Sequence, residues 1–387
     1  MNRRNIWLIG IIVVALILVI VLASFKINGF LNLKNNKSEI LIGSIMPLSS
    51  DVAVYGNAIR KPLDLAVEEI NNSGGINGRQ IRIIYEDGLC DPKNSANAAN
   101  KLINIDKVDI MLAFCSGEVM GASPIITSNN KILLSSGAGS PDITYLEDND
   151  SVFRIFPSDS SSARKISESA INKKYNEIAL ISENENYSQA LIRSFNESYT
   201  QLGGNVLISE KFNSENKDFK TSVTKVLSKN PRAIYVVSLT AENLVEIVKL
   251  LKEYGFNGQI YTNELIASEN TLKNLGSLAN GIIFAEPRFD RDATKTKIFL
   301  ENLNSKYGKI ESDLPDSYFA TAYDTIYILR DVIDACGDKD IECIKKQLHN
   351  IKDYDATSGK LSIDSRGDTL FEFDLKIINN SKAEIYH

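Results

Sequence analysis

Short apolar runs alternate with longer amphipathic segments between residues 40 and 141. The short runs are rich in Ile, Val and Leu, which is typical of buried strands, and the longer segments repeat apolar residues every three or four positions, which is typical of helices. We expect strands at 40–46, 81–86, 108–114 and 131–135, and helices at 56–71, 93–103 and 119–129. This alternation predicts a parallel sheet with right-handed crossovers.

A second series of the same kind begins after Pro157. Its expected strands are 177–182, 206–212, 233–238, 259–262 and 281–285, and its expected helices are 160–173, 188–202, 219–228, 242–254 and 268–275. Three further helices are expected at 294–307, 315–336 and 341–350, and a hairpin at 359–364 and 370–378. Because three helices are too few for another domain, we expect them to cover the first sheet and the hairpin to join the second.

The pattern therefore predicts an α/β fold of two lobes with parallel sheets. A chain of 387 residues is too long for one ordinary α/β core. We expect lobe 1 to comprise residues 39–156 and 287–358, and lobe 2 to comprise residues 157–286 and 359–387. Three crossings between the lobes would form a hinge, with a ligand-binding cleft between them.

The N-terminus predicts a membrane segment. Arg3 and Arg4 precede an uncharged apolar stretch at 6–25, which is about the length that a membrane-spanning helix needs. The two arginines place residues 1–5 in the cytoplasm and the rest of the chain outside the cell membrane, with 26–38 as a tether. The alternative is a cleaved signal, which would release a secreted or periplasmic protein.

Charge and cysteine content narrow the function classes. The formal net charge of −6 argues against nucleic acid as a partner, because that would require a basic surface. Four cysteines, an even number, fit an exported protein with disulfides. Cys90 and Cys115 follow neighbouring strands, and Cys336 and Cys343 are close in sequence, so we expect these two pairs.

Metal, cofactor and catalytic motifs are not evident in the sequence. Neither cysteine pair has CxxC spacing, and the chain contains only two histidines, so we expect no metal site. A Gly-x-Ser-x-Gly nucleophile motif and a zinc-type histidine pair are also missing from the sequence. We therefore expect no organic cofactor and no enzyme activity.

Two turns at expected strand ends are suited to binding a small anion. They are residues 115–117 (Cys-Ser-Gly) and residues 137–141 (Gly-Ala-Gly-Ser-Pro). Ligands of open α/β sheets bind beyond the carboxyl ends of the strands, where helix N-termini present free N–H groups. The alternative interpretation is that Ser116 only caps a helix and that the second turn is rich in small residues for steric reasons.

Several motifs are similar to those of a known family. They are residues 42–49 followed by Tyr55-Gly56, residues 66–71, residues 74–79, Glu86-Asp87 with residues 90–92, Cys115-Ser116, residues 141–144, and Asp218-Phe219. From residue 40 to its end, the chain resembles the type I periplasmic binding proteins, specifically the branched-chain amino-acid receptors of ABC transporters. The resemblance implies two Rossmann-like lobes joined by a three-strand hinge, an arrangement often compared with a Venus flytrap.

The resemblance also implies roles for individual residues. Ser116 would contact a ligand carboxylate, Gly137 would offer its carbonyl to the ligand ammonium, and Glu264 would face that ammonium. The residues taken together as ligand-binding are Tyr55, Ser116, Gly137, Ala138, Gly139, Ser140, Tyr187, Leu239 and Glu264. Relatives carry a hydroxyl where this chain has Gly139, so Ser140 would have to replace it. Leu239 stands where several relatives have an aromatic residue, which indicates an altered side-chain pocket.

The expected function is capture of a small zwitterionic amino acid, branched-chain-like or related, and its delivery to ABC permease subunits. We expect a monomer that is held at the membrane by the N-terminal helix. One alternative is a membrane-anchored ligand-sensing ectodomain. Another is the binding of an amide, urea or an aromatic acid on the same fold.

Overall fold

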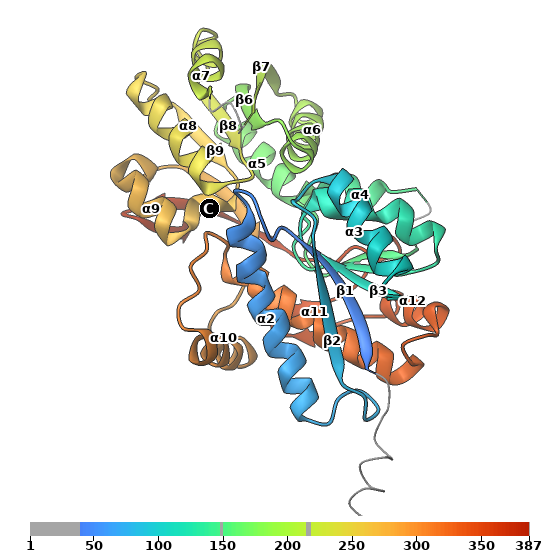
Figure 1. The fold of residues 1–387 in the computed structure, drawn as a ribbon. Coiled ribbons are helices and arrows are strands. Elements are labelled where there is room, and N and C mark those ends of the chain that lie inside the picture. The colour runs from blue at the N-terminus through green and yellow to red at the C-terminus, as the bar shows by residue number, and fades with distance from the viewer. Residues whose placement is uncertain (1–38, 148–149, 214–217, 387) are drawn as a thin grey trace, which may run out of the picture.

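The computed structural model describes residues 39–147, 150–213 and 218–386, which form two α/β lobes (Figure 1). The expected cytoplasmic segment 1–5, membrane segment 6–25 and tether 26–38 lie outside the described residues. Among the helices that are described, none combines the length and the apolar character needed to cross a membrane.

Lobe 1 is built on a five-stranded sheet with the order β2-β1-β3-β4-β5, in which all neighbours are parallel. Its strands are β1 (Ile40–Met46), β2 (Ile81–Asp87), β3 (Ile110–Ala113), β4 (Ile132–Ser135) and β5 (Val152–Arg154). Its helices are α2 (Ala53–Asn72), α3 (Pro92–Asn104), α4 (Ser116–Ser128), α10 (Thr294–Tyr307), α11 (Asp316–Cys336) and α12 (Ile341–His349), with the 3₁₀ helix η1 (Pro141–Tyr145). Side chains of the three late helices belong to the core of lobe 1, where α10 packs against α2 and α12 packs against α11.

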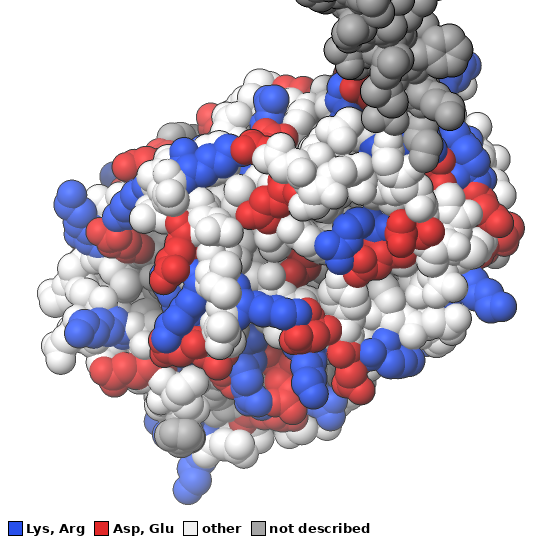
Figure 2. Space-filling view, turned by 90° about the horizontal axis from the view of Figure 1, so that it is seen from below, with Lys and Arg blue, Asp and Glu red and all other residues white. Residues whose placement is uncertain are grey.

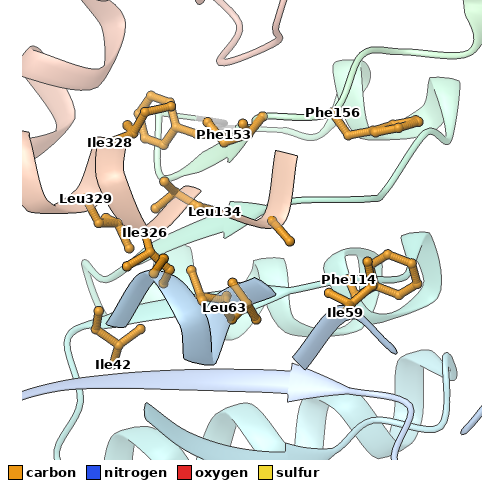
Figure 3. Close-up of a cluster of buried hydrophobic side chains, with 14 of the residues drawn as sticks. Ile42, Ile59, Leu63, Phe114, Leu134, Phe153, Phe156, Ile326, Ile328 and Leu329 are labelled. Carbon is orange, nitrogen blue, oxygen red and sulfur yellow. The ribbon is translucent and has the colours of Figure 1, made fainter. Parts of the chain in front are cut away.

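Two hydrophobic clusters fill lobe 1, one on each face of its sheet. Helices α3 and α4 cover one face, and α2 and α11 cover the other (Figure 1). In the larger cluster, Ile42 and Leu134 of the sheet meet Leu63 of α2 and Ile326 of α11. Phe114 and Phe156 lie together at one end of this cluster (Figure 3).

Lobe 2 is built on a seven-stranded sheet with the order β14-β13-β10-β9-β8-β6-β7. Its strands are β6 (Glu177–Glu183), β7 (Asn205–Phe212), β8 (Ala233–Val237), β9 (Gln259–Thr262), β10 (Ile283–Pro287), β13 (Phe373–Asn379) and β14 (Lys382–Ile385). Its helices are α5 (Ser160–Asn172), α6 (Asn186–Gln201), α7 (Phe219–Leu227), α8 (Ala241–Glu253) and α9 (Glu269–Leu275), with η3 (Glu264–Ala267) and η4 (Gly276–Ala279). Helices α5 and α6 pack on one face, and α7, α8 and α9 pack on the other.

The chain reverses at the expected turn, where Ile363 pairs antiparallel with Thr369, but this reversal packs with lobe 1 and does not join the second sheet. Strand β11 (Tyr354–Ala356) pairs with β12 (Gly359–Leu361), and Leu361 and Ile363 are buried in the core of lobe 1. Residues just after 358 therefore pack with lobe 1 rather than with lobe 2. The hairpin that joins the second sheet is β13–β14, which adds antiparallel strands at the edge formed by β10.

The chain passes between the lobes three times. The first crossing follows β5, the second follows β10, and the third lies between β12 and β13. This is the two-lobed fold with three connecting segments that the resemblance implied.

Both expected disulfides are present, and the four cysteines are all paired. Cys90–Cys115 joins the loop after β2 to the residue before α4, with 5.2 Å between the Cα atoms. Cys336–Cys343 joins the end of α11 to α12. Figure 2 shows Lys and Arg side chains interspersed with Asp and Glu on the face that it presents, with no continuous basic surface there.

Candidate functional site

A cavity lies between the two lobes at the carboxyl ends of their strands. It encloses about 460 Å³, part of which is open to solvent. Lobe 1 contributes residues after β3 and β4, and lobe 2 contributes residues after β8 and β9. The lining residues are Tyr55, Phe114, Cys115, Ser116, Gly137, Tyr187, Ser238, Leu239, Asn263, Glu264, Leu265, Leu314 and Tyr318.

Most of the predicted ligand-binding residues meet at this cavity. Tyr55, Ser116, Gly137, Tyr187, Leu239 and Glu264 line it. Ala138, Gly139 and Ser140 belong to the same loop as Gly137 but are not among the lining residues. The Ser140 hydroxyl accepts a hydrogen bond from Asp142 N at 3.3 Å and so caps η1.

The loop at residues 137–140 uses most of its backbone groups internally. The Ala138 and Ser140 carbonyls accept from Arg154, and the Gly139 carbonyl accepts from Asp159 N at 2.8 Å. Ala138 N donates to Ser135 Oγ, and Ser140 N donates to Ser116 Oγ. Among the described residues, the Gly137 carbonyl and the N–H groups of Gly137 and Gly139 have no such partner, and buried backbone groups are nearly always paired. These groups are available to a ligand.

Ser116 begins α4 beside this loop and is buried. Its oxygen accepts the Ser140 N–H at 3.1 Å, so its own hydroxyl hydrogen remains to be donated. The first N–H groups of α4 have no acceptor within the helix and carry the positive end of its dipole. The N-terminus of α4 therefore offers donors to an anionic group.

The buried side chain of Glu118 holds the start of α4 through hydrogen bonds to the backbone of the preceding turn. Its Oε2 atom accepts from Phe114 N at 3.1 Å and from Cys115 N at 2.9 Å, and the side chain is fully buried. Burial raises the pKa of Glu118 to about 8, although the backbone donors act in the opposite direction. The glutamate thereby holds the turn that presents Ser116.

Two buried carboxyl groups define the acidic side of the site. Glu264 of η3 lines the cavity and accepts a hydrogen bond from Tyr318 Oη at 2.8 Å. Asp159, just before α5, is buried, and its Oδ2 atom has no hydrogen-bond partner among the described residues. Burial raises the pKa of both groups, and the Glu264 charge raises the pKa of Asp159 further. A cation bound between them would favour the ionised form of both.

Asp159 also occupies the space beside Gly139. A Cβ atom placed on Gly139 would lie 2.1 Å from Asp159 Oδ2. A side chain at position 139 is therefore incompatible with this placement of Asp159, which explains in steric terms how the chain lacks the hydroxyl of its relatives.

The remainder of the wall is aromatic and aliphatic. Tyr318 stacks on Phe156 with 4.2 Å between ring centroids and meets Phe114 edge to face. The rings of Tyr55 and Tyr187 and the side chains of Leu239, Leu265 and Leu314 complete it. Such a wall is suited to an apolar side chain.

Several wall residues were not predicted from the sequence. Phe114, Ser238, Asn263, Leu265, Leu314 and Tyr318 line the cavity, and Asp159 lies directly behind it. Phe114, Ser238 and Asn263 follow expected strands, so their positions at strand ends were a usable signal. Tyr318 lies on α11 and reaches the site only because the chain returns to lobe 1, so its spacing gives no signal.

Metal ligands gather at one place among the described residues, where Cys90, Cys115 and Glu118 lie close together. The two sulfur atoms form a disulfide, so neither is available as a thiolate. The group is structural.

Two α/β lobes joined by three crossings around a cavity define a solute-binding protein of the type I periplasmic fold. The chain matches the family described as periplasmic binding protein over residues 39–376. It therefore belongs to this family, whose members serve ABC transporters, together with the Leu/Ile/Val-binding proteins.

Individual relatives are similar over nearly the whole chain. The leucine-, isoleucine-, valine-, threonine- and alanine-binding protein of Pseudomonas aeruginosa is 23% identical over 357 residues, which are 92% of this chain and 93% of that protein. The leucine-binding protein of Thermotoga maritima has a TM-score of 0.79 at 22% identity, covering 90% of this chain and 98% of that one.

Two further solved structures were obtained with ligands. A branched-chain amino-acid transporter substrate-binding protein of Streptococcus pneumoniae, in complex with isoleucine, has a TM-score of 0.76 at 26% identity, covering 90% of this chain and 98% of that one. A solute-binding protein of R. palustris, in complex with benzoate, has a TM-score of 0.78 at 17% identity, covering 90% and 95%.

Proposed function

We propose that this protein captures a free amino acid with an apolar side chain, of the branched-chain type, in the cavity between its lobes. The observation that carries the proposal is the chemistry of the wall. Ser116 and the N-terminus of α4 offer donors on the lobe 1 side, Glu264 supplies a carboxyl group on the lobe 2 side with Asp159 buried behind the lining, and the remainder is largely apolar.

The donor side is suited to a carboxylate. The Ser116 hydroxyl and the first N–H groups of α4 lie together at the cavity, without a basic side chain beside them. Hydrogen bonds to an ionised acceptor are short and strong, so a few aligned donors bind a carboxylate without a buried cation. Among the described residues that line the cavity, none is Lys or Arg.

The acidic side is suited to an ammonium group. Glu264 and the unpaired Gly137 carbonyl both accept hydrogen bonds, and Asp159 adds a second buried carboxyl nearby. Buried charges are costly unless they are paired, so a ligand cation would relieve the cost of both carboxylates. A zwitterion satisfies the two sides at once.

The apolar part of the wall can receive the side chain of a small ligand. The ligand side chain would lie among the rings of Tyr55, Phe114 and Tyr318 and the side chains of Leu239 and Leu314. Isoleucine in the S. pneumoniae relative is a ligand of this kind.

An aromatic acid is the second candidate, because the wall is rich in aromatic rings and the R. palustris relative was solved with benzoate. A benzoate would leave Glu264 and Asp159 without a cationic partner. The two carboxyls therefore favour the amino acid.

We further propose that the loaded protein delivers its ligand to an ABC permease on the outer side of the cell membrane, as a monomer held there by residues 6–25. The competing role is that of a ligand sensor. Coexpression with a candidate permease, followed by uptake of labelled amino acid, separates the two roles, because a sensor would not support uptake.

The ligand is tested by a thermal-shift screen of the full-length chain. The panel contains the twenty amino acids, benzoate, 4-hydroxybenzoate, acetamide and urea. A ligand that binds only the native state raises the melting temperature with its concentration. We expect leucine, isoleucine and valine to give the largest shifts, followed by calorimetric titration of each.

A response to benzoates alone would contradict the proposal and would assign the site to aromatic acids. A response to acetamide or urea alone would contradict it too, because neither ligand carries an ammonium group.

A further inference from the structure

A fully buried arginine stands behind the loop at residues 137–140. Arg154, at the end of β5, has no exposed side-chain surface and does not line the cavity. Its Nη1 atom donates to the Ser140 carbonyl at 2.7 Å and lies 3.4 Å from the Ala138 carbonyl. The guanidinium thus binds two alternate carbonyls of the loop from the side opposite the cavity.

Those two contacts determine which backbone groups the loop presents. With Ala138 and Ser140 turned towards Arg154, the intervening Gly139 carbonyl accepts from Asp159 N. The carbonyl of Gly137, which lines the cavity, then remains for a ligand. If the Ala138 or Ser140 carbonyl turned around, the loop would present an additional acceptor to the carboxylate side of the site.

The guanidinium is held in turn by the third crossing between the lobes. Arg154 Nε donates to Asp368 Oδ1 at 2.7 Å, and Arg154 Nη2 donates to Thr144 Oγ1 at 2.6 Å. Thr144 Oγ1 also donates to Asp368 Oδ2 at 2.6 Å, which closes the network. Every side of the buried charge is therefore paired.

The backbone of the same crossing is fixed against β5. Arg154 N donates to the Gly367 carbonyl at 2.8 Å, and Thr369 Oγ1 donates to the Arg154 carbonyl. Gly367 has φ +79°, and a Cβ there would lie 2.4 Å from the Val152 carbonyl oxygen, so only glycine fits. These backbone contacts fix residues 367–369 relative to β5, so the Asp368 side chain is held beside Arg154.

We propose that Arg154 is a positioning residue for ligand binding, which fixes the loop at 137–140 in its ligand-accepting conformation and is itself held by Asp368 and Thr144. The inference rests on the proposed function for its affinity readout. Arg154 would thus act on the site from outside the cavity. The third crossing would do more than connect the lobes, because its Asp368 holds Arg154 in place.

The test compares the buried Arg154–Asp368 pair with a half-buried arginine–aspartate pair in lobe 1. Arg154→Lys and Asp368→Asn alter the proposed network. Arg79→Lys and Asp338→Asn are matched controls, because Arg79 Nη1 donates to Asp338 Oδ1 at 2.6 Å and Nη2 to Oδ2 at 3.1 Å, near the opposite edge of the sheet. The full-length chain is titrated with L-leucine, L-isoleucine and L-valine, and backbone amide exchange at 137–141 is measured without ligand.

We expect Arg154→Lys and Asp368→Asn to weaken amino-acid binding about tenfold or more, because each removes a charge-assisted bond that orients the loop. The controls should leave the dissociation constant within about twofold, because their ion pair lies far from the loop and is partly exposed. Equal effects of the two pairs on affinity would overturn the inference and leave Arg154 a stability residue. If Arg154→Lys fails to fold, Thr144→Val tests the same network.

Failure of the proposed function is distinguishable from failure of this inference. If the wild type binds no amino acid, the proposed function is contradicted. Amide exchange at residues 137–141 then tests the positioning role of Arg154 by itself. Faster exchange at Ala138 and Ser140 in Arg154→Lys, but not in Arg79→Lys, then supports the positioning role, and unchanged exchange refutes it.

Discussion

Glu264 and Asp159 are two carboxyl groups that share one buried region without a basic residue in the cavity wall. Glu264 has the Tyr318 hydroxyl as a donor, whereas Asp159 Oδ2 has no donor among the described residues. Two like charges at such a site raise each other's pKa. The arrangement is therefore best satisfied when a ligand supplies positive charge.

Glu264→Gln should weaken amino-acid binding by about 10- to 100-fold, because hydrogen bonds to charged groups contribute roughly 1.5–3 kcal/mol. The fold should remain intact, since the amide keeps the shape and can still accept from Tyr318. Calorimetric titration measures the effect, with the exposed Glu253→Gln as control. Unchanged affinity would remove Glu264 from the site.

The same residue predicts a pH dependence of binding. The ligand ammonium prefers ionised Glu264, and burial raises the pKa of this carboxyl. Affinity should therefore fall as the pH is lowered through that pKa. Glu264→Gln should show a flatter profile, and equal slopes in the two proteins would contradict the assignment.

Gly139→Ser tests the steric relation with Asp159. The new Cβ would lie 2.1 Å from Asp159 Oδ2, and overpacking of this kind costs about 1–3 kcal/mol. We expect a lower melting temperature and weaker binding. The double variant Gly139→Ser with Asp159→Ala should recover stability, and strictly additive losses would show that the two residues do not compete for space.

Sequence patterns pointed to the turns at 115–117 and 137–141, because a parallel sheet gathers its strand ends at one edge, and the family resemblance added Glu264. Ser116, Gly137 and Glu264 follow expected strands and do line the cavity. Tyr318 and Asp159 were not found. Tyr318 enters from a late helix, and Asp159 precedes an expected helix, where an acidic residue ordinarily suggests a cap and not a site.

At the scale of elements, helix α4 begins at Ser116, three residues before the expected start at 119. The apolar repeat begins only at Val119, so it identified the buried face of the helix but not its first three residues. The earlier turn forms because Glu118 accepts from the backbone of Phe114 and Cys115. Side-chain capping, which periodicity does not report, set this boundary.

Glu118 should make stability depend on pH. Its pKa is about 8 in the folded chain and near 4.5 when it is unfolded. The folded state binds more protons between these values, so stability should be greatest at low pH and fall by up to about 1.4 kcal/mol per pH unit up to pH 8. Urea denaturation of Glu118→Gln should show a smaller fall, whereas the exposed Glu301→Gln should match the wild type. If stability fell equally with pH in the wild type, Glu118→Gln and Glu301→Gln, Glu118 would not be the source of the pH dependence.

The two disulfides should differ in the stability they confer. Their sequence separations are 25 and 7, and chain-entropy arguments give about 3.5 kcal/mol for the longer loop and about 2.5 for the shorter. Cys90→Ala with Cys115→Ala should therefore reduce the free energy of unfolding more than the other double variant. The opposite order would show that packing outweighs loop length here.

The expected reversal at Arg366-Gly367-Asp368 does form, because Ile363 pairs antiparallel with Thr369 and Gly367 N donates to the Asp364 carbonyl at 3.2 Å, but it packs on lobe 1. The hairpin that joins the second sheet turns instead at Asn380-Ser381, both with positive φ, between β13 and β14. Turn chemistry identified a reversal of the chain but not which strands it connects, since that is decided by tertiary pairing with β10.

At the scale of the whole molecule, side chains bridge the lobes around the cavity. Ala241 N of lobe 2 donates to Tyr55 Oη of lobe 1 at 3.3 Å, and Tyr318 of lobe 1 donates to Glu264 of lobe 2. Arg193 pairs with Asp142 at the rim. A ligand that contacts both lobes would add to these bonds and shift the population towards the closed arrangement.

Tyr55→Phe should weaken binding by about two- to tenfold, because it removes one inter-lobe hydrogen bond worth roughly 0.5–1.5 kcal/mol while its ring still lines the cavity. Titration measures the affinity, and small-angle scattering measures the radius of gyration, which should increase without ligand. Tyr254→Phe, an exposed tyrosine, is the control. Identical values for both variants would show that this bond does not restrain the lobes.

The late return of the chain also sets the order in which the protein can be completed during synthesis. Asp368, which holds Arg154, and β13, which covers the edge of β10, belong to the last part of the sequence. Until these residues leave the ribosome, lobe 1 lacks the partner of a buried charge and lobe 2 has an open sheet edge. The final packing of both lobes therefore depends on residues that follow β12.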